Sequence, residues 1–224
     1  MRSPQSLPEL PTLDSEIYRL TTETDTRSIL AALTVDHALL NDGPVYWLDA
    51  CNHAATDPVT AVAPSPRILD RIHVARGFTP YQHYSIADAL VSHVEADPPG
   101  LIVAPAVDAL YEETATGVAG DELLARTVAR LTAINRVHEC PVLLTTVRDD
   151  TVSAPVFEAM DVDLRCEQTC HGPRFVGGDF ETLVYPVGKG WVQTTIAYWQ
   201  SIIDARQSVY AAHGHSTPAE ELIV

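Results

Sequence analysis

Lysine and glycine are scarce in this sequence, and both are absent where a phosphate-binding loop would need them. Residues 17–21 alternate between apolar and polar side chains and predict a short strand, and residues 27–40 carry apolar side chains at helical spacing. A turn between a strand and a helix, here residues 22–26, is where nucleotide-binding α/β domains hold phosphate, using glycines and a lysine. The first glycine of the chain is Gly43, and its one lysine is Lys189. The sequence therefore excludes the motif GxxxxGK[ST] at this turn.

Long apolar runs are absent as well. No stretch approaches the roughly 18 consecutive apolar residues of a membrane span, and residues 1–11 lack the apolar core of a secretory signal. We therefore expect a cytoplasmic protein. A chain of 224 residues with 46% hydrophobic residues is sufficient for one large domain. We expect a flexible arm at residues 1–13, the domain at residues 14–212, and a loosely ordered tail at residues 213–224.

Basic residues are few. Lysine and arginine together number 14, against 30 aspartates and glutamates, which gives a formal net charge of −16. This acidic, lysine-poor composition resembles that of cytoplasmic proteins from halophiles that accumulate salt, in which concentrated salt screens the repulsion between carboxylates. An ordinary acidic protein is the alternative. In molar salt the net charge does not exclude nucleic-acid binding, because the electrostatic part of that binding is already suppressed.

The four cysteines, Cys51, Cys140, Cys166 and Cys170, have irregular spacing. In a cytoplasmic protein such cysteines are expected to be free thiols. The cluster Cys166, Cys170 and His171 could supply zinc ligands. However, two cysteines four positions apart on a strand point to the same face, which is ordinary core packing. The sequence leaves both interpretations open.

The middle of the chain alternates apolar strands with helical patterns, which predicts an α/β fold. Strands that alternate with helices favour a mostly parallel sheet with helices on both faces. Residues 101–107 are apolar on both faces, as a central parallel strand requires. The expected strands are residues 45–50, 71–76, 101–107 and 141–147; the expected helices are residues 84–95 and 121–137, the latter with Asp121 as its N-cap; residues 49–66 are expected to form a loop.

After Arg148 the pattern changes. Residues 148–160 are polar and contain proline, and they predict a mobile loop. Residues 182–187 and 191–196 have strand composition and flank a Gly-Lys-Gly sequence at residues 188–190, which is typical of a hairpin turn. The sheet is therefore expected to end in an antiparallel hairpin. The remaining expected elements are a strand at residues 163–169 and a final helix at residues 197–212.

Three stretches, taken with the order of the elements, resemble the core domain of RecA-type recombinases, particularly the archaeal RadA group. Residues 71–78 (RIHVARGF) are similar to that family's third strand, and residues 101–110 (LIVAPAVDAL) resemble its Walker B strand and the exit from it. Residues 120–126 and 140–147 resemble the helix and strand that follow. The resemblance covers residues 14–210. It implies a RecA-like twisted sheet with helices on both faces and a C-terminal antiparallel hairpin.

The chain departs from this family wherever the family carries out ATP chemistry. Besides the absent phosphate loop, Ala104 and Pro105 stand where the resemblance implies a metal-binding aspartate, and Asp108 lies three residues further on. Thr145 and Thr146 stand in place of the family's Asn-Gln sensor. Phosphoryl transfer depends on positioning and charge neutralisation by these groups. We therefore expect no ATP hydrolysis, and we assign no catalytic residue, cofactor or metal.

Three functional hypotheses follow from these features. The first is a non-catalytic RecA/RadA-like protein that regulates or scaffolds DNA repair or recombination. Folds of this kind assemble edge to edge, so the expected partner is a recombinase, a polymerase or a single-strand-binding protein. The second is a small enzyme that uses Asp49, Cys51 and His53 at the carboxyl edge of the sheet, where open α/β domains place their sites.

A third hypothesis is a DNA-binding module. It would act through the loops at residues 112–120 and 148–160. A nucleic-acid interface normally shows clustered basic residues. The arginines near these loops form no convincing basic stripe; they are Arg126, Arg130, Arg136 and Arg148.

Overall fold

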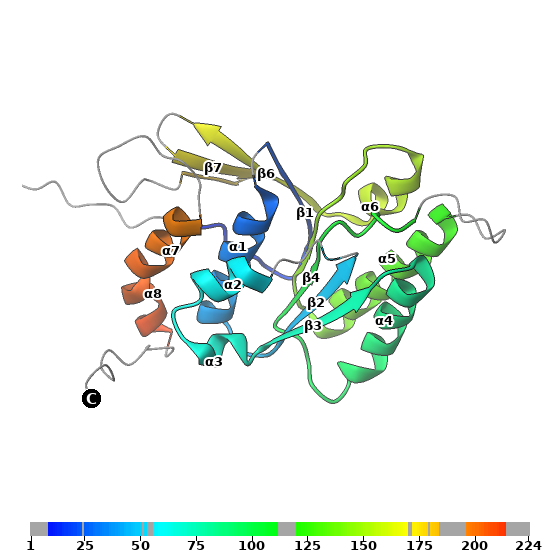
Figure 1. Cartoon of the computed structure of the whole chain (residues 1–224), viewed down its shortest axis with the longest axis horizontal. Coiled ribbons are helices and arrows are strands. Elements are labelled where there is room, and N and C mark those ends of the chain that lie inside the picture. Colours follow the sequence, from blue (N-terminus) through cyan, green and yellow to red (C-terminus); the bar gives the residue numbers. More distant parts are fainter. Residues whose placement is uncertain are drawn as a thin grey trace, which may run out of the picture.

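An eight-stranded sheet forms the centre of the protein in the computed structural model, which describes residues 9–23, 25–50, 52, 56–111, 120–169, 172–178, 180–183 and 196–213 (Figure 1). The strand order is β3-β2-β4-β5-β1-β6-β7-β8. Strands β1 to β6 run parallel, whereas β7 is antiparallel to β6 and β8 is antiparallel to β7. The predicted α/β class, with a mostly parallel sheet and antiparallel strands at its C-terminal end, is confirmed. The strands are β1 (Ile17–Thr22), β2 (Val45–Ala50), β3 (Ile72–Gly77), β4 (Leu101–Ala104), β5 (Val142–Leu144), β6 (Val162–Thr169), β7 (Gly172–Gly177) and β8 (Phe180–Leu183).

Helices cover both faces of the sheet (Figure 1). Leu101 and Val103 of β4 pack in the core shared with α1, α2, α3, α7 and α8, while Ile102 and Ala104 pack in the core shared with α4, α5 and α6. All four side chains are buried, because the strand is covered on both sides. The helices are α1 (Thr26–Leu40), α2 (Thr56–Val62), α3 (Pro66–Leu69), α4 (Pro80–His93), α5 (Gly120–His138), the 3-10 helix η1 (Thr151–Ser153), α6 (Ala154–Ala159), α7 (Ile196–Ala205) and α8 (Gln207–Ala212).

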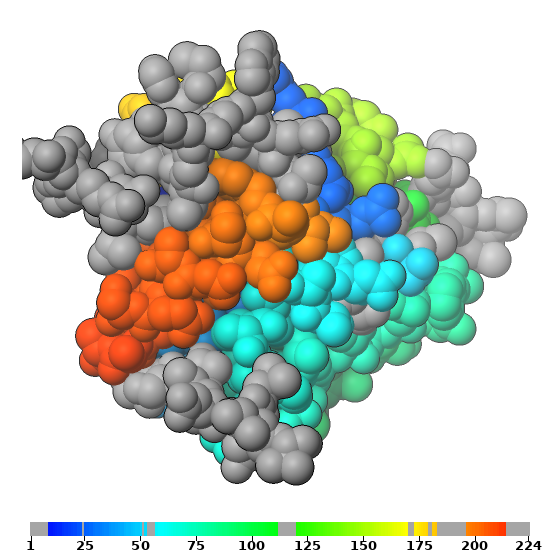
Figure 2. Space-filling view, turned by 60° about the vertical axis from the view of Figure 1, so that its left-hand side comes forward, coloured from blue at the N-terminus to red at the C-terminus, as the bar shows by residue number. Residues whose placement is uncertain are grey.

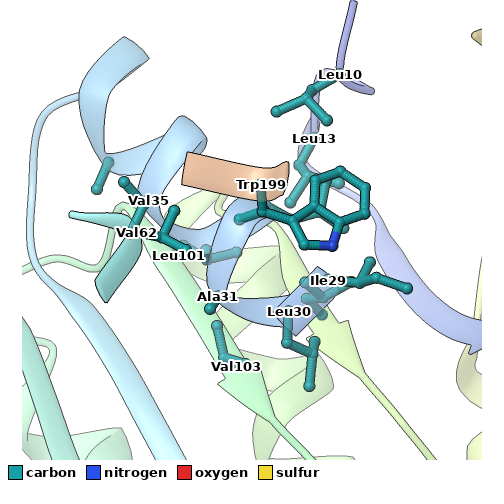
Figure 3. Close-up of a cluster of buried hydrophobic side chains, with 14 of the residues drawn as sticks. Leu10, Leu13, Ile29, Leu30, Ala31, Val35, Val62, Leu101, Val103 and Trp199 are labelled. Atoms are coloured by element: carbon teal, nitrogen blue, oxygen red, sulfur yellow. The ribbon is translucent and has the colours of Figure 1, made fainter. Parts of the chain in front are cut away.

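Trp199 of α7 anchors the C-terminal helices to the core. Its side chain is fully buried beside Leu10, Leu13, Ile29 and Leu30 (Figure 3). Helices α7 and α8 lie over this face next to α2 and α3 (Figure 2). Leu10 and Leu13 belong to the segment that was expected to be a flexible arm, so in the described chain the core begins before residue 14.

Two predicted loops contain helices. Within residues 49–66 lies α2, whose Val59 and Val62 are buried against α1 and α7. Within residues 148–160 lie η1 and α6, whose Val156 is fully buried. Both predictions were wrong for the same reason: proline was taken as a loop signal, although a helix tolerates proline in its first turn.

Several predicted boundaries also differ from the structure. Helix α4 begins at Pro80 rather than residue 84, because Thr79 caps it by accepting a hydrogen bond from the Gln82 amide at 3.2 Å. Helix α5 begins at Gly120, so Asp121 lies in its first turn and is not its N-cap. Strands β4 and β5 are shorter than predicted, and Ala106 after β4 adopts a left-handed φ of 48°.

The C-terminal region differs from the sequence prediction in two further ways. Strand β7 was not predicted, and β8 overlaps only the start of the strand expected at residues 182–187. The expected hairpin turn at residues 188–190 lies outside the described residues. The final helix is divided at Arg206, whose guanidinium pairs with Asp36 of α1 in the interior, with 2.8 Å between Nε and Oδ1.

Candidate functional site

A crevice of about 380 Å³ opens at the carboxyl ends of the central strands. The connection from β1 leads to β2, in one direction across the sheet, whereas the connection from the adjacent strand β5 leads to β6, in the opposite direction. Open α/β sheets bind their ligands where such connections diverge. The crevice is therefore the position at which a nucleotide site would be expected. Its lining residues are Leu20, Thr21, Thr22, Asp25, Thr26, Arg27, Leu30, Pro105, Ala106, Thr145, Thr146 and Val147.

The N-terminus of α1 at this crevice is already occupied by a carboxylate of the chain itself. Asp25 caps the helix, accepting hydrogen bonds from the Arg27 amide at 3.2 Å and from the Ser28 hydroxyl at 2.6 Å. A helix N-terminus attracts anions through its unpaired amides and its positive dipole. The charge of Asp25 offsets both attractions. The neighbouring Arg27 guanidinium is 3.8 Å from Asp25, and both side chains are more than half exposed, so this ion pair is weak.

The opposite wall of the crevice is held by Asp108. Its side chain is fully buried and accepts hydrogen bonds from the amides of Val147 at 2.8 Å and Arg148 at 3.0 Å, and from the Ser153 hydroxyl at 2.7 Å. These three donors engage both carboxylate oxygens of Asp108. Asp108 thus joins the segment after β4 to the segment after β5.

Two further hydrogen bonds connect the same two segments. The hydroxyl of Thr145 accepts a hydrogen bond from the amide of Ala106 at 2.7 Å, and the Thr145 carbonyl accepts one from the Val107 amide at 2.9 Å. These bonds stabilise the left-handed backbone of Ala106, which is an unfavourable conformation for a residue other than glycine. Thr145 therefore supports the loop.

The Asp49 carboxylate lies at the end of β2 and is fully buried. It forms an ion pair with Arg76, which lies directly opposite it on β3. Cys51 and His53, the two other members of the proposed enzyme site, lie outside the described residues. The structure thus places Asp49 at the expected edge of the sheet, with its charge compensated by a neighbouring strand.

A buried hydrogen-bonded chain near Asp49 was not found from the sequence. His83 of α4 is buried, and its Nδ1 lies 2.8 Å from the hydroxyl of Tyr111, which lies 2.8 Å from the hydroxyl of Thr127 in α5. Burial lowers the pKa of His83 to about 4 and raises the pKa of Tyr111. The imidazole is therefore neutral at pH 7, and the chain of hydrogen bonds ties α4 to α5. An isolated histidine gives no sequence signal for this role.

The proposed zinc cluster is only partly described. Cys166 is buried in β6, between Thr22 of β1 and Phe175 of β7 in the register of the sheet. Burial, with a smaller contribution from the charge of Glu167, raises the pKa of this thiol to about 12. Cys170 and His171 lie outside the described residues.

Metal ligands do not gather elsewhere in the described chain. Among those residues, no three His, Cys, Asp or Glu side chains come close enough together to hold a metal ion. The helices of the same part of the chain include none that is long and apolar enough to cross a membrane.

The arginines near the proposed DNA-binding loops mostly face carboxylates. Arg126 pairs with Glu122 at 2.6 Å, and Arg130 pairs with Asp88 at 2.9 Å. Arg148 lies 3.6 Å from Asp150. Residues 112–119 are outside the described residues, and residues 154–159 form α6. The local charge around these arginines is therefore largely balanced, which does not favour binding to a phosphate backbone.

Strand β3 forms one edge of the sheet, with β2 as its neighbour on the inner side. Three large apolar side chains are exposed on or just after it: Val74 at 41%, Phe78 at 60% and Tyr81 at 43% of their surface. We call these three residues the β3 patch. An edge strand with exposed apolar side chains is a ready template for pairing with another chain. The β3 patch is therefore a candidate contact surface.

An apolar groove of about 380 Å³ runs beside this strand, between β3 and α4. Gly77 permits the close approach of the helix, since a Cβ at that position would lie 2.8 Å from the backbone nitrogen of His83. Tyr46 lies between the rings of His73 and His93, with centroids 5.6 Å and 5.4 Å away. The groove residues are Tyr46, Trp47, Leu48, His73, Val74, Ala75, Ile86, Ala89, Leu90 and His93.

Comparison with known proteins found no family model and no curated sequence that matches this chain. Two regions stand out. One is the crevice, whose polar groups Asp25 and Thr145 are engaged within the chain and whose wall is held from behind by Asp108; the other is the groove with the β3 patch, whose apolar groups face outward.

Proposed function

We propose that this chain is a non-catalytic RecA/RadA-like protein that acts in the cytoplasm as a regulatory or scaffolding partner in DNA repair or recombination. Its partner is a recombinase, a polymerase or a single-strand-binding protein. The observation that carries the proposal is the apolar groove beside the exposed edge strand β3. Binding of another protein at an edge of the sheet does not require nucleotide chemistry, so this function can persist without it.

The physical character of the groove favours a peptide segment as the bound element. A strand added to β3 would pair with the backbone groups on its outer side, and this mode of recognition gains affinity from main-chain hydrogen bonds. The neighbouring groove would receive alternate side chains of the added strand, because successive side chains of a strand point to opposite faces. Val74 pairs with Trp47, whose side chain packs on the α1 face of the sheet, so the exposed side chain of Val74 offers apolar surface on the face of β3 opposite the groove.

The aromatic members of the β3 patch support the same assignment. Phe78 and Tyr81 lie in the turn and the first helical turn that follow β3. Aromatic side chains are enriched among the residues that dominate binding energy at protein interfaces. Exposed apolar surface concentrated in one place is also a recognised mark of interaction sites.

The state of the crevice supports a non-catalytic role. Phosphoryl transfer needs a phosphate cradle and a metal-bridged nucleotide. Asp25 places a negative charge at the N-terminus of α1, and the carboxylate of Asp108 accepts hydrogen bonds from donors of the protein itself. These groups stabilise loops that in an ATPase would contact nucleotide.

Co-purification from native extract in molar KCl tests the proposal. The wild-type chain should recover a recombinase, a polymerase or a single-strand-binding protein, and Val74→Arg should lose it because a charge would replace apolar surface that the partner covers on the edge strand. The matched control is Val137→Arg on α5, where the side chain is 74% exposed and far in sequence from β3. Both variants should unfold within about 0.5 kcal/mol of the parent, as is usual for exposed positions. Equal recovery by all three proteins would refute docking at β3.

A further inference from the structure

We draw no further inference here: the strongest candidate, the crevice lined by Asp25, Arg27, Thr145 and Thr146 at the carboxyl ends of β1 and β5, belongs to the site already described, and with Asp25 capping the helix its remaining hydroxyl groups and one exposed guanidinium single out no class of ligand.

Discussion

The crevice at the carboxyl ends of the strands and the edge at β3 belong to one sheet, but their side chains are used in opposite ways. In the crevice, Asp25 and Thr145 accept hydrogen bonds from the chain itself, and behind its wall so does Asp108. At β3, Val74 and Phe78 leave apolar surface exposed. Polar groups that are satisfied internally stabilise the fold, whereas exposed apolar surface is stabilised only when something covers it. The difference favours contact at β3 over chemistry in the crevice.

The largest expected effect tests whether β3 is the contact surface or whether the C-terminal aromatics are. Trp199→Ala should lower the free energy of unfolding by about 3–5 kcal/mol, because a fully buried aromatic is removed from the core. Denaturant unfolding in molar KCl measures this. The partly buried neighbour Tyr198, whose ring lies 5.2 Å from that of Trp199, provides a control in which truncation should cost less. A Trp199→Ala protein of unchanged stability that no longer recovers the partner would move the interface to α7.

The role of the crevice wall can be tested by replacing the buried carboxylate of Asp108. Asp108→Asn keeps the shape of the side chain but replaces one acceptor oxygen with a donor that faces backbone amides and a hydroxyl. Leaving buried donors unsatisfied should reduce stability by about 2–3 kcal/mol. The exposed neighbour Asp149→Asn should stay within about 0.5 kcal/mol of the parent. If Asp108→Asn is as stable as the parent, this carboxylate is not needed by the fold and is available for a ligand.

The sequence predicted the central elements well because they are strongly periodic. Residues 101–104 are apolar at every position, and α1 and α5 carry long helical patterns, so burial and local propensity agree there. The short helices α2 and α6 were not predicted, since each contains a proline and only a few apolar residues. Their helical state depends on packing against α1 and α5, which a local pattern does not contain.

The candidate site shows a similar division. The lack of glycine and lysine in the turn after β1 can be read directly from the sequence, because an absent residue type is visible in any sequence, whereas the capping of α1 by Asp25 was not predicted. The partners of Asp108 lie about 40 residues away along the chain, and those of His83 lie in other elements. Contacts of this kind are set by the three-dimensional arrangement. The β3 patch could not be predicted either, because the sequence of residues 71–76 does not show whether this strand lies at the edge of the sheet.

Two buried histidines, His37 of α1 and His83 of α4, should make the stability of the protein depend on pH. Burial is the largest cause that lowers the pKa of His37 and of His83 to about 4, whereas an unfolded histidine titrates near 6.5. Between these values the unfolded chain binds protons that the folded chain does not, so stability falls as the pH is lowered. Each histidine should lower the free energy of unfolding by about 2 kcal/mol as the pH falls from 7 to 5.

Chemical denaturation across this pH range measures the effect. His83→Gln should be less stable than the parent at pH 7, because the hydrogen bond to Tyr111 changes, but its stability should depend less steeply on pH. His213→Gln is the control, since that side chain is exposed at the end of α8. A His83→Gln slope equal to that of the parent would mean that the pKa of His83 is the same in the folded and the unfolded chain.

The smallest expected effect is the absence of any response to ATP. A micromolar site at millimolar Mg-ATP would be about 1,000-fold above its Kd and would stabilise the protein by about 4 kcal/mol. We expect no shift in the melting temperature in molar KCl, because the crevice has a capping carboxylate at the helix end and neither glycines nor a lysine in the preceding turn. Asp25→Asn keeps a good N-cap while removing the charge, and it should also fail to bind. A shift in the parent would overturn the comparison on which the proposed function rests. A shift in Asp25→Asn alone would show that this single carboxylate, rather than the absence of a glycine-rich loop, excludes the nucleotide.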